Sequence, residues 1–138
     1  LLKKTRSRIM ASIRAKNTRP ELAIRRGLFR VGYRYRIHDS KLPGRPDIVL
    51  PKYQLAIFVN GCFWHGHHCK NFRWPQTNVK YWTAKIKNNM QRDAEAKRRI
   101  RALGWRSLTV WECSIHRRSA KHIARVISRI CEQVQPKS

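Results

Sequence analysis

The chain has 138 residues, 32 of them Lys or Arg and 7 Asp or Glu, so its formal net charge is +25 with neutral histidine. This length and a hydrophobic content of 41% predict one domain over residues 1–138 and exclude a disordered basic tail. So large a charge opposes folding unless a polyanion offsets it, which indicates a nucleic acid partner. No apolar run approaches the roughly 18 residues of a membrane span and no leader opens the chain, so we expect a soluble, intracellular protein.

The first third of the chain predicts a basic segment and a helix. Residues 1–16 are basic with apolar residues at helical spacing, which indicates an N-terminal arm or helix. A capping-box pattern at residues 18–21 predicts a helix from about Pro20 to Val31. Ile24 and Leu28 are expected on the inner face of this helix.

Three strands and a long loop are expected next. Aromatic and basic residues alternate over residues 33–37, which predicts a half-exposed strand. A Pro- and Gly-rich turn separates it from a second strand at 47–50, and the apolar run 54–59 is typical of a buried central strand. Residues 60–75 form a loop dense in Gly, His, Cys and Trp, and loops of this length are usually functional.

The remaining residues predict helix, strand and helix. The longest helix covers residues 78–103 and ends at Gly104, a strand spans 105–111, and an amphipathic helix spans 121–135. The order of elements predicts an α/β fold in which helices flank a mixed sheet. Apolar positions at steps of three and four define the expected buried face of the longest helix: Trp82, Ile86, Met90, Ala96 or Lys97, Ile100 and Leu103.

Few carboxylates occur in this basic chain, so each needs a reason to be there. Asp47 starts a strand after a Pro-Gly-Arg-Pro turn, where it either caps the turn or binds Mg²⁺ against a phosphate. Glu21 is explained by the capping box or by a catalytic role. Asp93 falls in the buried register of its helix, and because a buried charge costs several kcal/mol, it requires an arginine or a cation as partner. His65 has an imidazole suited to a general base, although most loop histidines have no catalytic role.

The cysteines indicate a metal site rather than disulfides, because three of the four lie near histidines or carboxylates. His67, Cys69, Asp93 and Cys113 make one tetrahedral zinc set. His68 is an alternative to His67, Cys62 is a competing ligand, and buried free thiols are the simplest alternative to a metal.

Four segments in order resemble the very-short-patch repair (Vsr) endonucleases: residues 42–49, 56–69, 81–93 and 104–113. The resemblance extends from about Thr5 to Cys113. It implies a restriction-endonuclease-like fold and a Mg²⁺-dependent nick in one strand of duplex DNA, 5′ to the thymine of a T:G mismatch left by 5-methylcytosine deamination. It also implies a monomer in the bacterial cytoplasm that acts at the nucleoid, alongside other mismatch-repair proteins and away from membranes.

The resemblance also assigns roles by position. Asp47 and the backbone carbonyl of Val59 would contact Mg²⁺, His65 would be the general base, and Glu21 the acidic residue of the first helix. The zinc ligands would be the set named above. The DNA contacts would be the following residues, of which the first three would insert as wedges beside the mismatch: Phe63, Trp64, Trp82, Lys85, Asn89 and Met10. Judged from the residues alone, these three aromatic side chains could instead pack in the core.

Two positions depart from related nucleases. The strand at 54–59 lacks the acidic-x-Lys pair of the wider fold, so histidine must take over the work of that lysine. Asn60 stands where the best-known members carry histidine, and at neutral pH its amide can only hydrogen-bond or orient. We nevertheless expect activity because His65 is present. A restriction-type endonuclease that cuts paired DNA, a non-catalytic zinc-stabilised DNA-binding protein and a membrane-surface protein are the alternatives.

Overall fold

The computed structural model describes residues 19–62, 66–67, 69, 74–118 and 120–134. The N-terminal arm or helix expected at residues 1–16 lies outside these ranges, as does Thr18 of the capping box. Among the described helices, none is long and apolar enough to cross a membrane.

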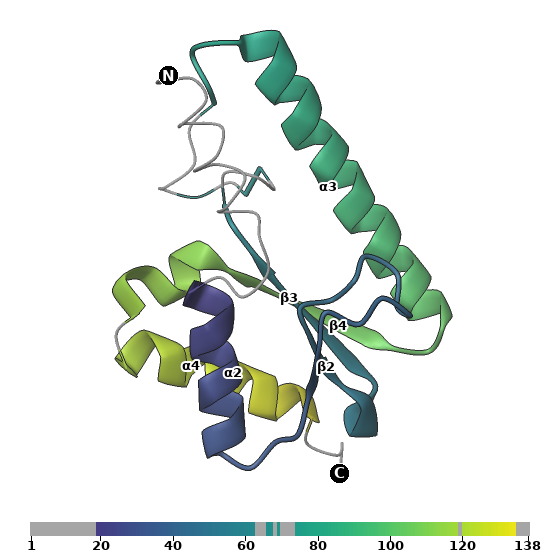
Figure 1. The fold of residues 1–138 in the computed structure, drawn as a ribbon, viewed down its shortest axis with the longest axis vertical. Helices are drawn as coiled ribbons and strands as arrows, with labels where there is room; N and C mark the ends of the chain where they lie inside the picture. The colour runs from purple at the N-terminus through teal and green to yellow at the C-terminus, as the bar shows by residue number, and fades with distance from the viewer. Residues whose placement is uncertain (1–18, 63–65, 68, 70–73, 119, 135–138) are drawn as a thin grey trace.

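A four-stranded mixed sheet forms the centre of the described fold (Figure 1). In spatial order its strands are β1 (Arg36–Ile37), β2 (Ile48–Leu50), β3 (Leu55–Asn60) and β4 (Arg106–Trp111). β1, β2 and β3 pair antiparallel, whereas β3 and β4 run parallel because a long helix connects them. The helices are α2 (Arg19–Arg30), α3 (Val79–Ala102) and α4 (Ala120–Val134), with short 3₁₀ helices η1 (Pro51–Tyr53) and η2 (Glu112–Arg118). This confirms the predicted α/β class and the predicted order of helices and strands.

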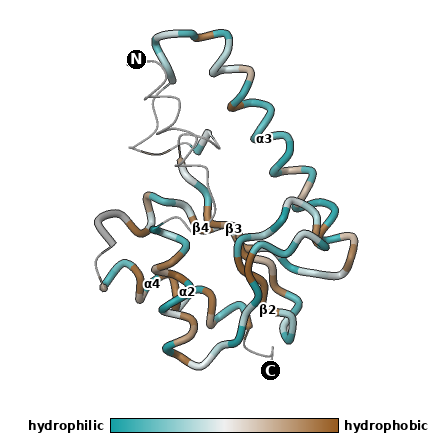
Figure 2. Tube along the Cα trace, viewed as in Figure 1, coloured by the Kyte–Doolittle hydropathy of each residue, from teal (hydrophilic) through white to brown (hydrophobic). Residues whose placement is uncertain are grey.

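The core has two sides because β3 is buried on both faces. Leu55 and Ile57 pack in one cluster with residues of α2 and α4, and the intervening Ala56 and Phe58 pack with Ile100 of α3. Figure 1 shows α2 and α4 together on one side of the sheet and α3 on the other. Apolar residues gather along the strands, α2 and α4, whereas most of α3 is hydrophilic (Figure 2).

Helix boundaries agree closely with expectation. Ile24 and Leu28 of α2 are fully buried, as predicted. The expected end of α3 at Gly104 is also confirmed, since its φ of 85° lies in the left-handed region. Gly104 N–H donates to the Arg101 carbonyl at 3.0 Å and Trp105 N–H to the Ile100 carbonyl at 3.2 Å, which is a Schellman motif that directs the chain into β4.

Two details were predicted wrongly. The strand expected at 33–37 pairs only over Arg36–Ile37, because the Tyr33 N–H instead donates to the Leu28 carbonyl and completes the end of α2. On α3, Met90 and Leu103 are 42% and 57% exposed rather than buried. The buried line runs through Ile86, Asn89, Ala96 and Ile100, and Leu103 is already the C-cap.

Candidate catalytic and metal-binding sites

One candidate site joins α2 to the ends of β1 and β2. Glu21 lies in the first turn of α2, His38 directly follows β1, and Asp47 directly precedes β2. One potential ligand atom from each of these three residues lies within 4.8 Å of the others. The described structure therefore brings two predicted carboxylates, distant in sequence, to one place.

Asp47 is held at the start of β2 by a contact with β3. Its Oδ2 accepts a hydrogen bond of 2.7 Å from the Val59 N–H. Burial, together with the nearby negative charge of Glu21, raises the pKa of Asp47 to about 6, while the Val59 hydrogen bond and His38 oppose the shift. Two carboxylates at one partly buried point form a hard oxygen donor set, which fits Mg²⁺ and would be stabilised by it.

Glu21 is 1% exposed and has tertiary partners. His38 Nε2 lies 3.0 Å from both of its carboxylate oxygens, and Arg25 Nη1 donates to Oε2 at 2.9 Å. A carboxylate so deeply buried requires such partners, because its lost hydration has to be replaced. Its side chain therefore contributes to the interior of the fold, whether or not it also closes the capping box.

Asn60 is the last residue of β3 and follows Val59, whose N–H contacts Asp47. It is 6% exposed and lies opposite Trp111 in the parallel pair of β3 and β4. Val59, whose carbonyl is the expected second Mg²⁺ contact, lies opposite Val110. Both residues therefore lie at the carboxyl ends of two parallel strands, where open α/β sheets commonly bind ligands.

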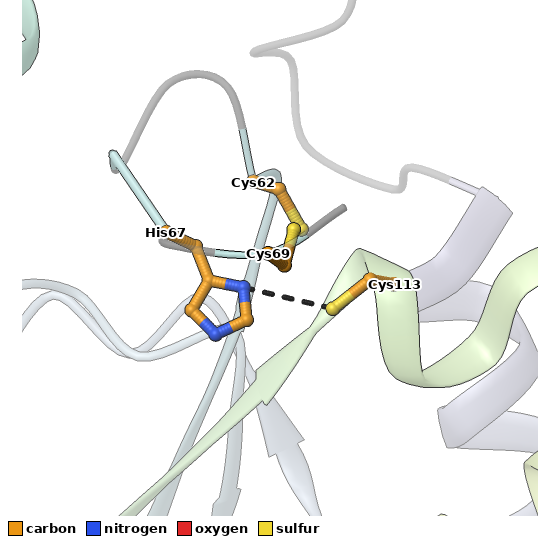
Figure 3. A group of neighbouring side chains, drawn as sticks. All are labelled: Cys62, His67, Cys69 and Cys113. Carbon is orange, nitrogen blue, oxygen red and sulfur yellow. Dashed lines mark hydrogen bonds between the residues drawn. The ribbon is translucent and has the colours of Figure 1, made fainter. Parts of the chain in front are cut away.

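A second candidate site gathers sulfur and nitrogen ligands. One such atom from each of Cys62, His67, Cys69 and Cys113 lies within 4.8 Å of the others (Figure 3). The Nδ1 of His67 lies 3.6 Å from the Cys113 sulfur, and the imidazole stacks on Trp111 with ring centroids 4.0 Å apart. Burial raises the pKa of the Cys62 thiol to about 12 and also raises that of Cys113. Three thiols and an imidazole are a donor set that fits zinc.

The zinc prediction agrees with this group at three positions. His67, Cys69 and Cys113 come together as predicted, and the fourth member is Cys62, the competing ligand, where Asp93 was expected. Asp93 is half-buried on α3. His68 lies outside the described residues, and Asp93 as a ligand stays a prediction.

The predicted DNA contacts are only partly described. Phe63, Trp64, the predicted base His65 and Met10 lie outside the described residues. On α3, Trp82 and Lys85 are half-buried and Asn89 is 8% exposed. Their roles toward DNA stay predictions.

His38 was not predicted from the sequence. One signal was available: residues 38 and 47 bracket a turn rich in Pro and Gly. Pairing the flanking strands around that turn puts His38 opposite Asp47, and the His38 N–H does donate to the Asp47 carbonyl at 3.1 Å.

Comparisons with known proteins agree on one family. The family model described as DNA mismatch endonuclease Vsr matches residues 1–71, which include Glu21, His38 and Asp47. The type II nicking enzyme V.XorIIP of Xanthomonas oryzae is 47% identical over 107 residues, covering 78% of this chain and 79% of that protein. The DNA mismatch endonuclease Vsr of Escherichia coli is 43% identical over 116 residues, covering 84% and 74%. The type II nicking enzyme V.NmeAIP of Neisseria meningitidis is 37% identical over 131 residues and covers 94% of each chain.

Proposed function

This chain belongs to the DNA mismatch endonuclease Vsr family, and from that premise we propose that it nicks one strand of duplex DNA 5′ to the thymine of a T:G mismatch. The mismatch would arise by deamination of 5-methylcytosine. The observation that carries the proposal is the partly buried pair Glu21 and Asp47, two carboxylates held together in a chain of net charge +25. A protein that only bound DNA would gain nothing from a partly buried pair of carboxylates.

Asp47 and Glu21 would hold the catalytic cation. Mg²⁺, when bound, would supply Lewis-acid stabilisation of the negative charge that develops at the cleaved phosphate. The Val59 N–H fixes one oxygen of Asp47, and His38 and Arg25 fix Glu21, so the donors are oriented before the DNA arrives. The Val59 carbonyl would add a further oxygen ligand.

Proton transfer and orientation would fall to neighbouring residues. His65 would accept the proton of the attacking water, since an imidazole is a good base at neutral pH. Asn60, buried at the end of β3, would orient the water or the phosphate through its amide.

Recognition of the mismatch would rest on aromatic insertion. Phe63, Trp64 and Trp82 would enter the stack beside the T:G pair, while Lys85, Asn89 and Met10 contact its surroundings. A mismatch is cheaper to unstack than a normal pair, so part of the selectivity follows from deformation energy.

Structural zinc would hold the long loop in place. His67, Cys69 and Cys113 would supply three ligands, and Asp93 or Cys62 the fourth. We also infer that the mixed sheet corresponds to a restriction-endonuclease-like core, as the resemblance implies.

A nicking assay tests the function. End-labelled duplexes that differ only in a central T:G or T:A pair are incubated with protein and Mg²⁺, and we expect a single-strand nick 5′ to the mismatched thymine alone. Asp47→Ala should abolish nicking and leave DNA binding measurable. Asp39→Ala, which removes a carboxylate that accepts the Lys41 N–H, is the matched control.

The other outcomes have clear meanings. Cutting of both strands of the T:A duplex would support a restriction-type endonuclease instead. Binding without any nicking would support a zinc-stabilised DNA-binding protein, and full activity of Asp47→Ala would refute the catalytic assignment.

A further inference from the structure

His38 directly follows β1 and lies beside the carboxylates of Glu21 and Asp47. In the antiparallel register Ile37 lies opposite Ile48, so the next pair along is His38 with Asp47. The 3.1 Å bond from the His38 N–H to the Asp47 carbonyl continues that ladder by one step. Strand pairing therefore fixes the backbone of His38 relative to Asp47.

The backbone of His38 is in an unfavourable conformation. Its φ is 48°, in the left-handed region. That region costs a residue other than glycine about 1–2 kcal/mol, although asparagine, aspartate and histidine occur there more often than other side chains do. Residues held in such conformations by the surrounding fold cluster at functional sites. The case for a role of His38 therefore depends on what its side chain contacts.

The side chain of His38 reaches back to α2. Its Nε2 lies 3.0 Å from both oxygens of Glu21, and the two side chains are 13% and 2% exposed. Because an ionised carboxylate only accepts hydrogen bonds, Nε2 carries the proton and donates it to both oxygens. The imidazole thus fixes the direction of the carboxylate in a nearly dry environment.

Arg25 contacts the same carboxylate differently. It lies four residues after Glu21 on the same helix and donates to Oε2 alone at 2.9 Å. That bond moves with α2. The bond from His38 instead comes from the strand end that carries Asp47, so it ties the two carboxylates to each other.

We propose that His38 is a positioning residue of the divalent cation site, whose Nε2–H holds the Glu21 carboxylate where it shares a cation with Asp47. The inference rests on the proposed function, because it takes Glu21 and Asp47 as the cation-binding pair. Hydrogen-bond partners behind metal ligands typically affect metal affinity or activity by 10- to 100-fold. The expected effect of losing this donor is therefore large although His38 touches neither DNA nor metal in this role.

Two substitutions separate this role from a purely structural one. Asparagine suits the left-handed backbone, but its amide reaches only as far as Nδ1. Glutamine suits that backbone less well, but its amide nitrogen reaches about as far as Nε2. If His38 positions Glu21, His38→Gln retains function and His38→Asn loses it. If His38 matters only for the turn, the order is reversed.

The experiment measures cation binding with and without DNA. Mn²⁺ affinity of the free, zinc-loaded protein is measured by electron paramagnetic resonance, and the Mg²⁺ concentration for half-maximal nicking is measured on the T:G duplex. We expect both quantities to worsen at least 10-fold in His38→Asn and to stay within about threefold of wild type in His38→Gln. In a Glu21→Gln background, His38→Asn should add no further loss of Mn²⁺ affinity.

Several results would overturn the proposal. One is that His38→Asn binds Mn²⁺ with the affinity of wild type. Another is that His38→Gln folds but binds Mn²⁺ 10-fold more weakly than wild type. The second test holds even when His38→Asn does not fold. A wild-type protein that binds Mn²⁺ but does not nick refutes the proposed function and leaves the binding comparison decisive for His38. A wild-type protein that does neither refutes both.

Discussion

At the scale of single residues, the burial of charge at Asp47 affects the stability of the fold. Asp47 is surrounded by β1, β3 and α2, and burial with a neighbouring carboxylate raises its pKa to about 6 from an ordinary 3.8. A group that is harder to ionise in the fold than in the unfolded chain makes the fold less stable once it is charged. Without a cation, Asp47 therefore opposes folding at neutral pH.

Asp47→Asn should be more stable than wild type at pH 8 and equally stable below pH 4. The folded pKa is the higher one, so the stabilisation from the protonated carboxyl is complete below pH 3.8 and is lost as the pH rises through 6. The difference is up to about 3 kcal/mol, or on the order of 5–10 °C in melting temperature.

Thermal melts from pH 3.5 to 8 without added Mg²⁺ measure this difference. Asp39→Asn is the control and should follow wild type throughout. A melting temperature of Asp47→Asn that stays parallel to wild type across the range would refute the raised pKa.

The proposed zinc ligands can also be tested one residue at a time. Cys69→Ser and Cys113→Ser should each lower the zinc content toward zero and lower the melting temperature, because a structural zinc contributes directly to folding free energy. Cys131→Ser is the matched control, since Cys131 is half-buried on α4 outside the cluster. Zinc content by mass spectrometry and a thermal melt are the measurements; unchanged zinc in both variants would contradict the site.

The same assay assigns the fourth ligand. Zinc loss from Asp93→Asn alone supports the set inferred from the resemblance, and zinc loss from Cys62→Ser alone supports the set in Figure 3.

At the scale of elements, α3 packs against the loop that carries part of the Cys and His cluster. It connects the parallel strands β3 and β4, and its Ile86 and Met90 pack against Gly66, next to the candidate ligand His67. A Cβ at Gly66 would lie 2.6 Å from the Met90 sulfur and 3.0 Å from Ile86. The described part of the metal loop therefore depends on close approach to this helix.

Gly66→Ala should weaken zinc binding, and Gly104→Ala should not. Both glycines have positive φ, 60° and 85°, so both variants pay a backbone cost of about 1–2 kcal/mol. Only Gly66 is crowded, since a Cβ at Gly104 would meet nothing within 4 Å. Zinc release rates in the presence of a chelator compare the two; equal rates would mean that the contact with α3 does not support the loop.

At the scale of the whole molecule, positive charge sets the interaction with DNA. The net charge of +25 comes from 32 basic and 7 acidic residues, and several of the basic residues lie on exposed turns of α3. Contacts of such residues with phosphates release counterions, so they give affinity without sequence information. The proposed mismatch selectivity would then come from local DNA deformation and aromatic insertion.

Binding to a fully matched duplex should weaken steeply with salt. With six or more phosphate contacts, affinity falls on the order of 10³-fold between 50 and 200 mM salt. Fluorescence anisotropy measures this, and the ratio of T:G to T:A affinity should change far less over the same range. A nearly salt-independent affinity would contradict a binding mode dominated by phosphate contacts.

The order of helices and strands was predictable because it follows from local patterns. The apolar run of β3 and the glycine after α3 each act within a few residues. Asp47 could likewise be identified as a candidate site residue, because it is a carboxylate beside a Pro-Gly turn in a basic chain. The strand prediction failed at Tyr33, because its N–H bonds to the carbonyl of Leu28, five residues earlier, and completes α2 instead of pairing in β1.

By itself, the sequence determined the basic charge, the element order and most of the candidate ligands, because these depend on composition and short-range periodicity. Only the tertiary structure decided which side chains meet. It brought Glu21 next to Asp47, introduced His38 between a helix and a strand end, and placed Cys62 among the sulfur ligands. The physical reason is that strand register and helix packing join residues far apart in the chain, which no local pattern encodes.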